Sequence, residues 1–211
     1  ISACLVGSEM CIRDRVGAPV IESPKAEVLA VAEMVFEHAA QNPRQSLAVL
    51  TAGTRHAARI AEAVRRGLES RPDLREFFEP GQEPFRVLDL ARSQGLRRDR
   101  VIFSLGVAAE AGSRSSHFGQ LADQHGRQRF VKAMTTARFH TRIVSSLSLA
   151  QLQAADLRTG VKDLARFLAS FEASRERGDS GQAAILPPEH AGSEFLSVYD
   201  LSLIHISEPT R

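Results

Sequence analysis

The sequence predicts an α/β protein of three layers, with a mainly parallel β-sheet between two layers of helices. Short apolar runs, typical of strands that are buried on both faces, alternate with longer stretches in which apolar residues recur at helical spacing. This alternation is typical of parallel sheets whose strands are connected through helices. Ligands of such proteins bind beyond the carboxyl ends of the strands, so we expect the functional residues at that edge.

The first half of the chain supplies a strand between helices. Ser23 and Pro24 begin the first predicted helix, because a capping hydroxyl and a proline at the first helical position are both favoured there. The helical spacing continues to about Gln41. The following elements are a buried strand at 46–51, a helix at 54–69 and a short helix at 73–78.

The second half continues the alternation. Strands are predicted at 85–90, 100–105 and 142–147, and helices at 128–137 and 161–173. The segment 112–126 is polar and glycine-containing, which indicates a long loop. The charged stretch after Ser174 indicates a linker, and residues 194–200 are expected to begin another domain.

The two ends of the chain are related to each other at the level of DNA. Codons can be chosen for residues 201–211 (LSLIHISEPTR) so that the complementary strand, read one frame over, encodes residues 5–15 (LVGSEMCIRDR). Such ends resemble a sequencing adapter translated together with a genomic insert. We therefore expect residues 1–15 and 201–211 to be adapter-derived, 16–173 to form one domain, and 174–200 to hold a linker and the start of a truncated next domain.

Composition restricts the function only weakly. The formal net charge is +2, from 27 basic and 25 acidic residues, which is too balanced to indicate nucleic-acid or membrane binding. No apolar run approaches the roughly 18 residues that a membrane span requires. Both cysteines lie in the first 15 residues. The remaining chain without cysteine fits a reducing, cytoplasmic location.

The most informative stretch is FRVLDLARSQGLRRDRVIFSLG, at 85–106. It combines a strand, a turn with Gln94 and Gly95, a basic turn and a second strand. Glycine lets backbone amides approach a phosphate closely, so this turn is a candidate phosphate contact. The alternative is a solvated basic loop with a turn glycine.

This stretch resembles motif V of the superfamily 1 helicases, which reads QG-x-E-x-D and is followed by a strand. The segments SSHFGQL (115–121) and GRQRFVKAMTTAR (126–138) resemble that superfamily's FGPL…GGERRLNVAITRAR, which contains motif VI. Residues 47–64 resemble its motif IV. The likeness covers nearly all of residues 20–172 and is strongest to large bacterial AAA-type helicases related to the RNA-surveillance helicases.

The resemblance implies the second, C-terminal RecA-like domain (a P-loop NTPase-type fold) of an ATP-dependent helicase. ATP and Mg²⁺ would be held mainly by the first RecA-like domain of the parent chain, and no G-x-x-x-x-G-K-[ST] loop occurs in this sequence. We therefore expect no ATP turnover by this chain alone. The implied partners are that first domain and single-stranded nucleic acid, DNA more than RNA. The residues implied to contact ATP or nucleic acid are Thr51, Gln94, Gly95, Asp99, Gly106, Arg129 and Thr135.

The chain departs from the family pattern at three positions. Thr136 stands where the family has its arginine finger, and Arg138, two residues later, either replaces the finger or pairs with a local carboxylate. Arg97 replaces the motif V glutamate. His56 replaces the motif IV glutamine and is expected to be exposed on its helix.

Three functional alternatives remain open at this stage. The chain is the motor module of an active helicase or translocase, or a degenerate, non-catalytic nucleic-acid-binding module of the same fold. The third alternative is an unrelated doubly wound domain that binds a small nucleotide or metabolite.

Overall fold

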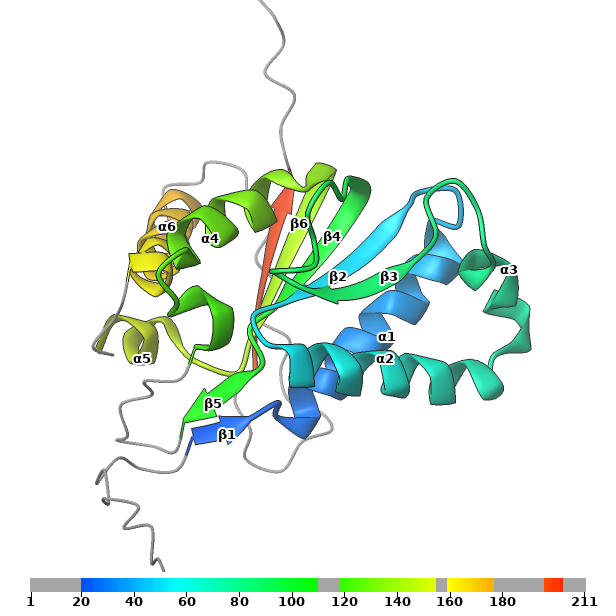
Figure 1. Ribbon diagram of the computed structural model, residues 1–211, viewed down its shortest axis with the longest axis horizontal. Helices are drawn as coiled ribbons and strands as arrows, with labels where there is room; N and C mark the ends of the chain where they lie inside the picture. The colour runs from blue at the N-terminus through cyan, green and yellow to red at the C-terminus, as the bar shows by residue number, and fades with distance from the viewer. Residues whose placement is uncertain (1–19, 110–117, 155–158, 177–195, 203–211) are drawn as a thin grey trace, which may run out of the picture.

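A five-stranded sheet organises the protein, which we describe from a computed structural model that covers residues 20–109, 118–154, 159–176 and 196–202 (Figure 1). The strand order is β3-β2-β4-β6-β7, and the first four strands run parallel while β7 is antiparallel to β6. The strands are β2 (Leu47–Thr51), β3 (Arg86–Asp89), β4 (Arg98–Ser104), β6 (Ala137–Ser145) and β7 (Ser197–Ser202).

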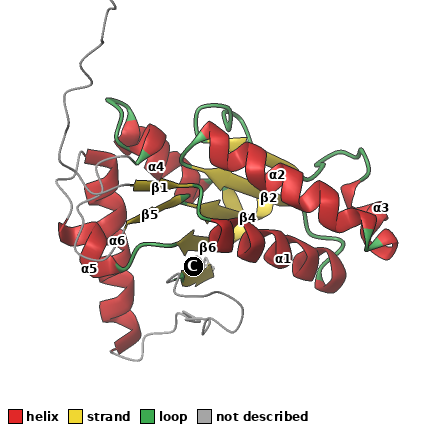
Figure 2. Ribbon diagram, turned by 90° about the horizontal axis from the view of Figure 1, so that it is seen from below, coloured by secondary structure: helices red, strands yellow, loops and turns green. Residues whose placement is uncertain are grey.

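Helices cover both faces of this sheet, as Figure 2 shows from below. One face carries α1 (Lys25–Gln41) and α2 (Thr54–Glu69), and the other carries α4 (Gly126–Thr135) and α6 (Thr159–Glu176). The shorter elements are η1 (Pro72–Leu74), α3 (Arg75–Phe78), η2 (Gly119–Leu121) and α5 (Leu149–Ala154). A separate antiparallel pair, β1 (Val20–Glu22) with β5 (Val107–Ala109), lies beyond the ends of β2 and β4.

The core is divided by the sheet because successive side chains of a strand point to opposite faces. Ile102 of β4 packs with α1 and α2, among residues such as Val31 and Ile60. Its neighbour Phe103 packs on the other face, with residues such as Leu168 of α6. The fold is therefore the three-layer α/β fold that the sequence predicted, of the Rossmann or RecA-like kind.

Several predicted boundaries differ from the structure. β6 begins at Ala137 instead of 142, and its first half alternates between buried and exposed side chains. We expected 194–200 to begin a following domain, whereas Ser197–Ser202 forms β7 of this sheet. The adapter origin expected for 201–211 stays a prediction. Val198, Tyr199 and Leu201 are buried there, so their apolar side chains complete the core beside β6. Among the described residues, no helix is both long and apolar enough to cross a membrane.

Candidate functional site at the carboxyl edge of the sheet

A pocket of about 200 Å³ opens at the edge where β2 and β4 end. The connections that leave these two strands form its walls together with Ser23 before α1, the start of α2 and Gly119 of η2. The residues that line it are Ser23, Ala52, Gly53, Thr54, Arg55, His56, Leu105, Gly106, Val107 and Gly119. This is the edge at which parallel α/β sheets place their ligands.

A buried carboxylate lies beneath this pocket. Glu27 of α1 is fully buried. Its Oε1 accepts hydrogen bonds from the Ser104 hydroxyl at 2.6 Å and from the Gly106 amide at 2.7 Å. Its Oε2 accepts from the hydroxyl and the amide of Ser146, at 2.8 and 3.2 Å. Because these donors belong to the ends of β4 and β6, one carboxylate joins α1 to two strand ends.

The hydrogen bonds of Glu27 fix the tautomer of His56. A carboxylate only accepts, so the single proton of the Ser104 hydroxyl is used in its bond to Glu27. The His56 Nε2 atom, 2.7 Å from the same hydroxyl oxygen, must then carry a proton and donate it. When the ring carries only this proton, its Nδ1 atom is an acceptor, and the Ser23 hydroxyl 2.8 Å away donates to it.

Ser23 occupies an unusual backbone position between β1 and α1. Its φ is 58°, in the left-handed region that non-glycine residues seldom adopt. We predicted that its hydroxyl caps α1. Instead Pro24 occupies the N-cap position, and no side chain caps the helix. The Ser23 hydroxyl forms its hydrogen bond with His56. Ser23 and His56 are 2% and 3% exposed, so the expectation of an exposed His56 was wrong.

Gly106 makes room for the His56 ring. Its φ is 72°, and a Cβ atom there would lie 2.4 Å from the ring's Cγ. Only glycine fits this position, because any side chain would overlap the imidazole and would disfavour the backbone conformation.

The carboxyl end of β3 carries a second polar cluster. Asp89 accepts from the Thr54 hydroxyl at 3.0 Å and from the Arg92 side chain at 2.8 Å. Burial of Asp89 opposes its ionisation, but hydrogen bonds from Arg92, Gln120 and Thr54 hold its pKa below the ordinary value. Arg129 lies nearby and donates to the Gln120 carbonyl at 3.1 Å, as well as to Asp123.

The opposite, amino edge of the sheet carries an ion-pair cluster around Arg138. Its guanidinium donates to Glu83 at 2.8 Å and to Asp99 at 3.1 Å. The bond from Arg138, followed by one from Ser46, lowers the pKa of Glu83 to about 2. Both carboxylates are therefore ionised at neutral pH, and Arg138 is occupied by them.

The residues expected from the sequence are distributed over both edges. Thr51 and Gly106 lie at the carboxyl edge, whereas Asp99 and Arg138 lie at the amino edge. Arg129 lies near the carboxyl edge, because it donates to the carbonyl of Gln120, and the backbone amide of Gln120 donates to the carbonyl of Ala52. These residues form no single rim.

Two predicted stretches nevertheless meet. The connection that contains Gln94 and Gly95, both exposed, runs from the end of β3 to the start of β4. There the Arg98 amide donates to the Thr136 carbonyl at 3.3 Å, at the end of α4. Thr135 is exposed, and its hydroxyl donates to carbonyls of its own helix. Thr136 is 2% exposed, and its hydroxyl donates to Lys132 of the same helix.

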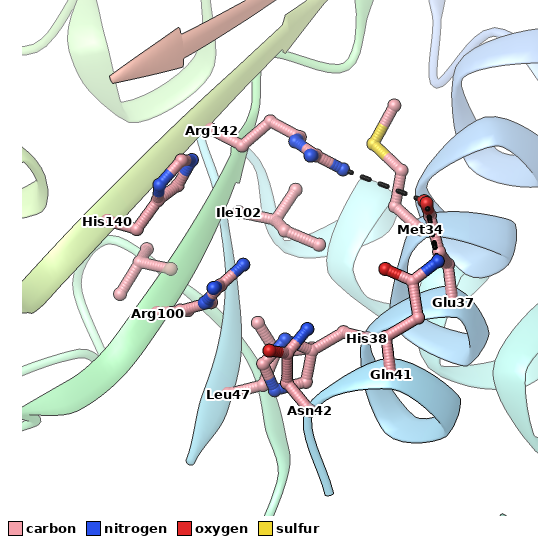
Figure 3. A pocket seen from close by; sticks show the side chains of 11 residues that line it. Met34, Glu37, His38, Gln41, Asn42, Leu47, Arg100, Ile102, His140 and Arg142 are labelled. Atoms are coloured by element: carbon pink, nitrogen blue, oxygen red, sulfur yellow. Dashed lines mark hydrogen bonds and ion pairs between the residues drawn. The ribbon is translucent and has the colours of Figure 1, made fainter. Parts of the chain in front are cut away.

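A smaller pocket of about 40 Å³ lies between α1 and the strands β4 and β6 (Figure 3). His38 projects into it from α1, while Arg100 and Arg142 approach from the strands. Burial is the main cause that lowers the pKa of His38, and the two arginines add to it. The pKa of His140 is lowered in the same way, although the contact with Asp200 acts in the opposite direction.

Little in the sequence indicated the buried network. Glu27 resembles an ordinary acidic residue in a first helical turn, and His56 an ordinary polar residue at the start of a helix. Ser104 and Ser146, which follow apolar strand residues at the expected ligand edge, were the available signal. Within the described residues, no group of three or more histidine, cysteine or acidic side chains is arranged to hold a metal ion.

Comparison with known proteins shows no family for this chain. No protein-family model matches the chain, and no curated protein matches it. Among solved structures, it is similar to a Listeria monocytogenes protein assigned to the class I S-adenosylmethionine-dependent methyltransferases, with a TM-score of 0.42 and 13% identity. The match covers 90% of this chain and 64% of that one.

Proposed function

We propose that this chain is the second RecA-like module of an ATP-dependent nucleic-acid helicase or translocase of superfamily 1. In this proposal it supplies one wall of an ATP cleft and part of the track for a single strand. The family resemblance favours DNA, and the binding test below uses both DNA and RNA. The parent enzyme would act in the cytoplasm. The first RecA-like domain of the parent chain would be its partner.

One observation carries the proposal. The stretches that resemble motifs V and VI are about 40 residues apart in the sequence, yet they meet at the amino edge of the sheet. The Arg98 amide donates to Thr136 at 3.3 Å, and Arg138 lies 3.1 Å from Asp99. The order of the motifs along the chain and this contact in space support the proposal.

The residues present do not hold ATP and Mg²⁺ by themselves. Arg138 is paired with Glu83 and Asp99, and Thr136 is buried and carries no charge. The described residues also include no cluster suited to a metal ion. We therefore assign no catalytic step to this chain, and ATP would have to be held by the partner domain.

The same facts favour a second candidate, a degenerate module that binds nucleic acid without contributing to hydrolysis. A finger must offer a cation to the charge that develops on a transferred phosphoryl group. Here the finger position has lost its cation, and the neighbouring arginine is neutralised by two carboxylates. The two candidates share the binding of single strands and differ in ATP hydrolysis.

Binding of single strands tests what the candidates share. Fluorescence anisotropy with labelled single-stranded DNA and RNA should detect weak binding that decreases with salt, because phosphate contacts release counterions. Arg97→Glu, in the exposed basic turn next to Gly95, should weaken it. Arg75→Glu makes the same charge change at an exposed position of α3, outside the stretches that resemble the helicase motifs, and should have little effect. Equal effects of both variants, or no binding at low salt, would contradict the proposal.

ATP hydrolysis separates the candidates. The chain alone should show no ATP turnover, and saturable turnover by it would contradict both. In a parent protein that includes the first RecA-like domain, Arg138→Ala should reduce turnover by about 10³-fold if Arg138 replaces the finger. An unchanged rate would favour the degenerate module.

A further inference from the structure

We propose that the pocket at the carboxyl edge is an acyl-transfer site, in which Ser23 is the nucleophile and His56 is its general base. The inference is independent of the helicase proposal. It depends on four features of the pocket: a serine in a strained turn, a histidine of fixed tautomer, a buried acid behind that histidine, and backbone donors at the start of α2.

The hydrogen-bond chain orients His56 for proton abstraction. Glu27 accepts from Ser104, Ser104 accepts from His56 Nε2, and Nδ1 thereby faces the Ser23 hydroxyl at 2.8 Å. This is the distance at which a base can take the proton of a nucleophile. The Glu27 carboxylate is also 3.6 Å from Nε2, so it stabilises the positive charge that the ring acquires after it takes the proton.

Ser23 has the backbone geometry of an activated serine. It lies at a sharp turn from a strand, β1, into a helix, α1, and its φ is 58°. A strained strand-to-helix turn presents a serine hydroxyl toward a pocket in serine hydrolases. The strain persists here because the Ser23 amide donates to the Gly106 carbonyl at 2.8 Å and its carbonyl accepts from Arg59.

The start of α2 is the part of the pocket that we assign to the developing oxyanion. Pro24 follows the nucleophile and has no N–H, so the usual donor after the serine is missing. The first turn of α2 lines the same pocket through Gly53 and Thr54, and no side chain caps this helix. The N–H groups of a first helical turn have no partner within the helix and can bind a negatively charged oxygen.

The reaction balances with water as the only co-reactant. The Ser23 oxygen attacks the carbonyl carbon of an ester while His56 Nδ1 takes the hydroxyl proton. The tetrahedral oxyanion collapses, the bond to the alcohol breaks, and the alcohol leaves with the proton from His56. Water then attacks the acyl-serine by the same route and releases the acid. The pocket, about 200 Å³, restricts the substrate to short acyl groups such as acetyl.

The test combines hydrolysis of p-nitrophenyl acetate with fluorophosphonate labelling and mapping of the labelled residue by peptide mass spectrometry. We expect the label on Ser23. Ser23→Gly and His56→Gln should each lower the rate above background by about 10²-fold or more. Glycine suits the left-handed backbone of position 23, so this variant separates loss of the nucleophile from unfolding.

A matched control is Ser93→Ala. Ser93 is equally buried, but its hydroxyl donates to the Leu90 carbonyl, outside the pocket. This variant should retain the label and the rate. Absence of label from Ser23 in the wild-type chain overturns the proposal, and so does a hydrolysis rate that Ser23→Gly leaves unchanged.

Discussion

Glu27 shows how a single buried residue organises the candidate site. Burying an ionised carboxylate is costly unless its oxygens accept hydrogen bonds. Four donors from Ser104, Gly106 and Ser146 satisfy it. The amides that follow β4 and β6 in turn need an acceptor, because the strand pairing has ended there, and Glu27 provides it. The polar network therefore determines which residues can follow these strands, and Gly106 is the most restricted of them.

Replacing Gly106 by alanine should destabilise the protein by about 2 kcal/mol or more, because overpacking and a left-handed backbone both oppose it. The added Cβ atom would lie 2.4 Å from the His56 ring. Chemical denaturation followed by circular dichroism measures the change. Gly81→Ala is the control, since a Cβ atom there meets nothing within 4 Å. If both variants unfold at the same denaturant concentration, the packing of Gly106 against His56 is wrong.

At the scale of elements, apolar periodicity was sufficient to predict the helices and strands in which it was strong. β2 is a run of five fully buried residues, and the apolar stripe of α2 matches its buried side chains Ala57, Ile60 and Val64. The first half of β6 was missed because its buried and exposed residues, including the exposed Phe139, give no continuous run. β7 was missed because its residues, SVYDLS, form no continuous apolar run, and the residues with which it pairs lie 52 to 62 positions earlier in the chain.

The candidate site was predictable only in its location. The ends of β2 and β4 follow from the strand pattern, and ligand sites of parallel sheets lie there. The contact between Ser23 and His56 joins residues 33 apart, and that between Ser146 and Glu27 joins residues 119 apart. Such contacts depend on how the helices pack, which composition and spacing do not encode.

The place of β7 in the sheet can be tested through Tyr199. Its side chain is 4% exposed, its ring contacts Phe171, and its hydroxyl donates to Glu172 of α6 at 3.0 Å. Tyr199→Ala should therefore reduce the free energy of unfolding by about 3 kcal/mol. Phe139→Ala, at an exposed position of β6, should change it by less than about 1 kcal/mol. A Tyr199 variant as stable as the wild type would mean that 197–202 does not belong to this sheet.

At the scale of the whole molecule, the groups that take up protons as the pH falls lie in different places on the sheet. At the amino edge, hydrogen bonds from Arg138 and Ser46 lower the pKa of Glu83, and, against the opposing effect of burial, hydrogen bonds from Ser46 and Arg138 lower that of Asp99. The face under α1 instead holds two histidines that burial keeps neutral, with Arg100 and Arg142 beside them. Carboxylates with lowered pKa values lose their stabilising effect only below about pH 4.5. Buried histidines with lowered pKa values reduce the free energy of unfolding at a higher pH, because the unfolded chain takes up protons there first. The histidines should therefore determine how stability responds to mild acid.

The free energy of unfolding should decrease as the pH falls from about 7.5 to about 5. His38 and His140 have folded pKa values below 6.5, so the unfolded chain binds more protons in this range. Protonation is then coupled to unfolding, and stability returns as the pH rises through the unfolded value. Asp200 opposes this effect at His140, and the arginines reinforce it at both rings. Urea unfolding at several pH values should show a shallower dependence for His38→Gln combined with His140→Gln. His125→Gln, at an exposed position, should keep the wild-type slope. An unchanged slope in the double variant would show that these two rings are already solvated in the folded protein.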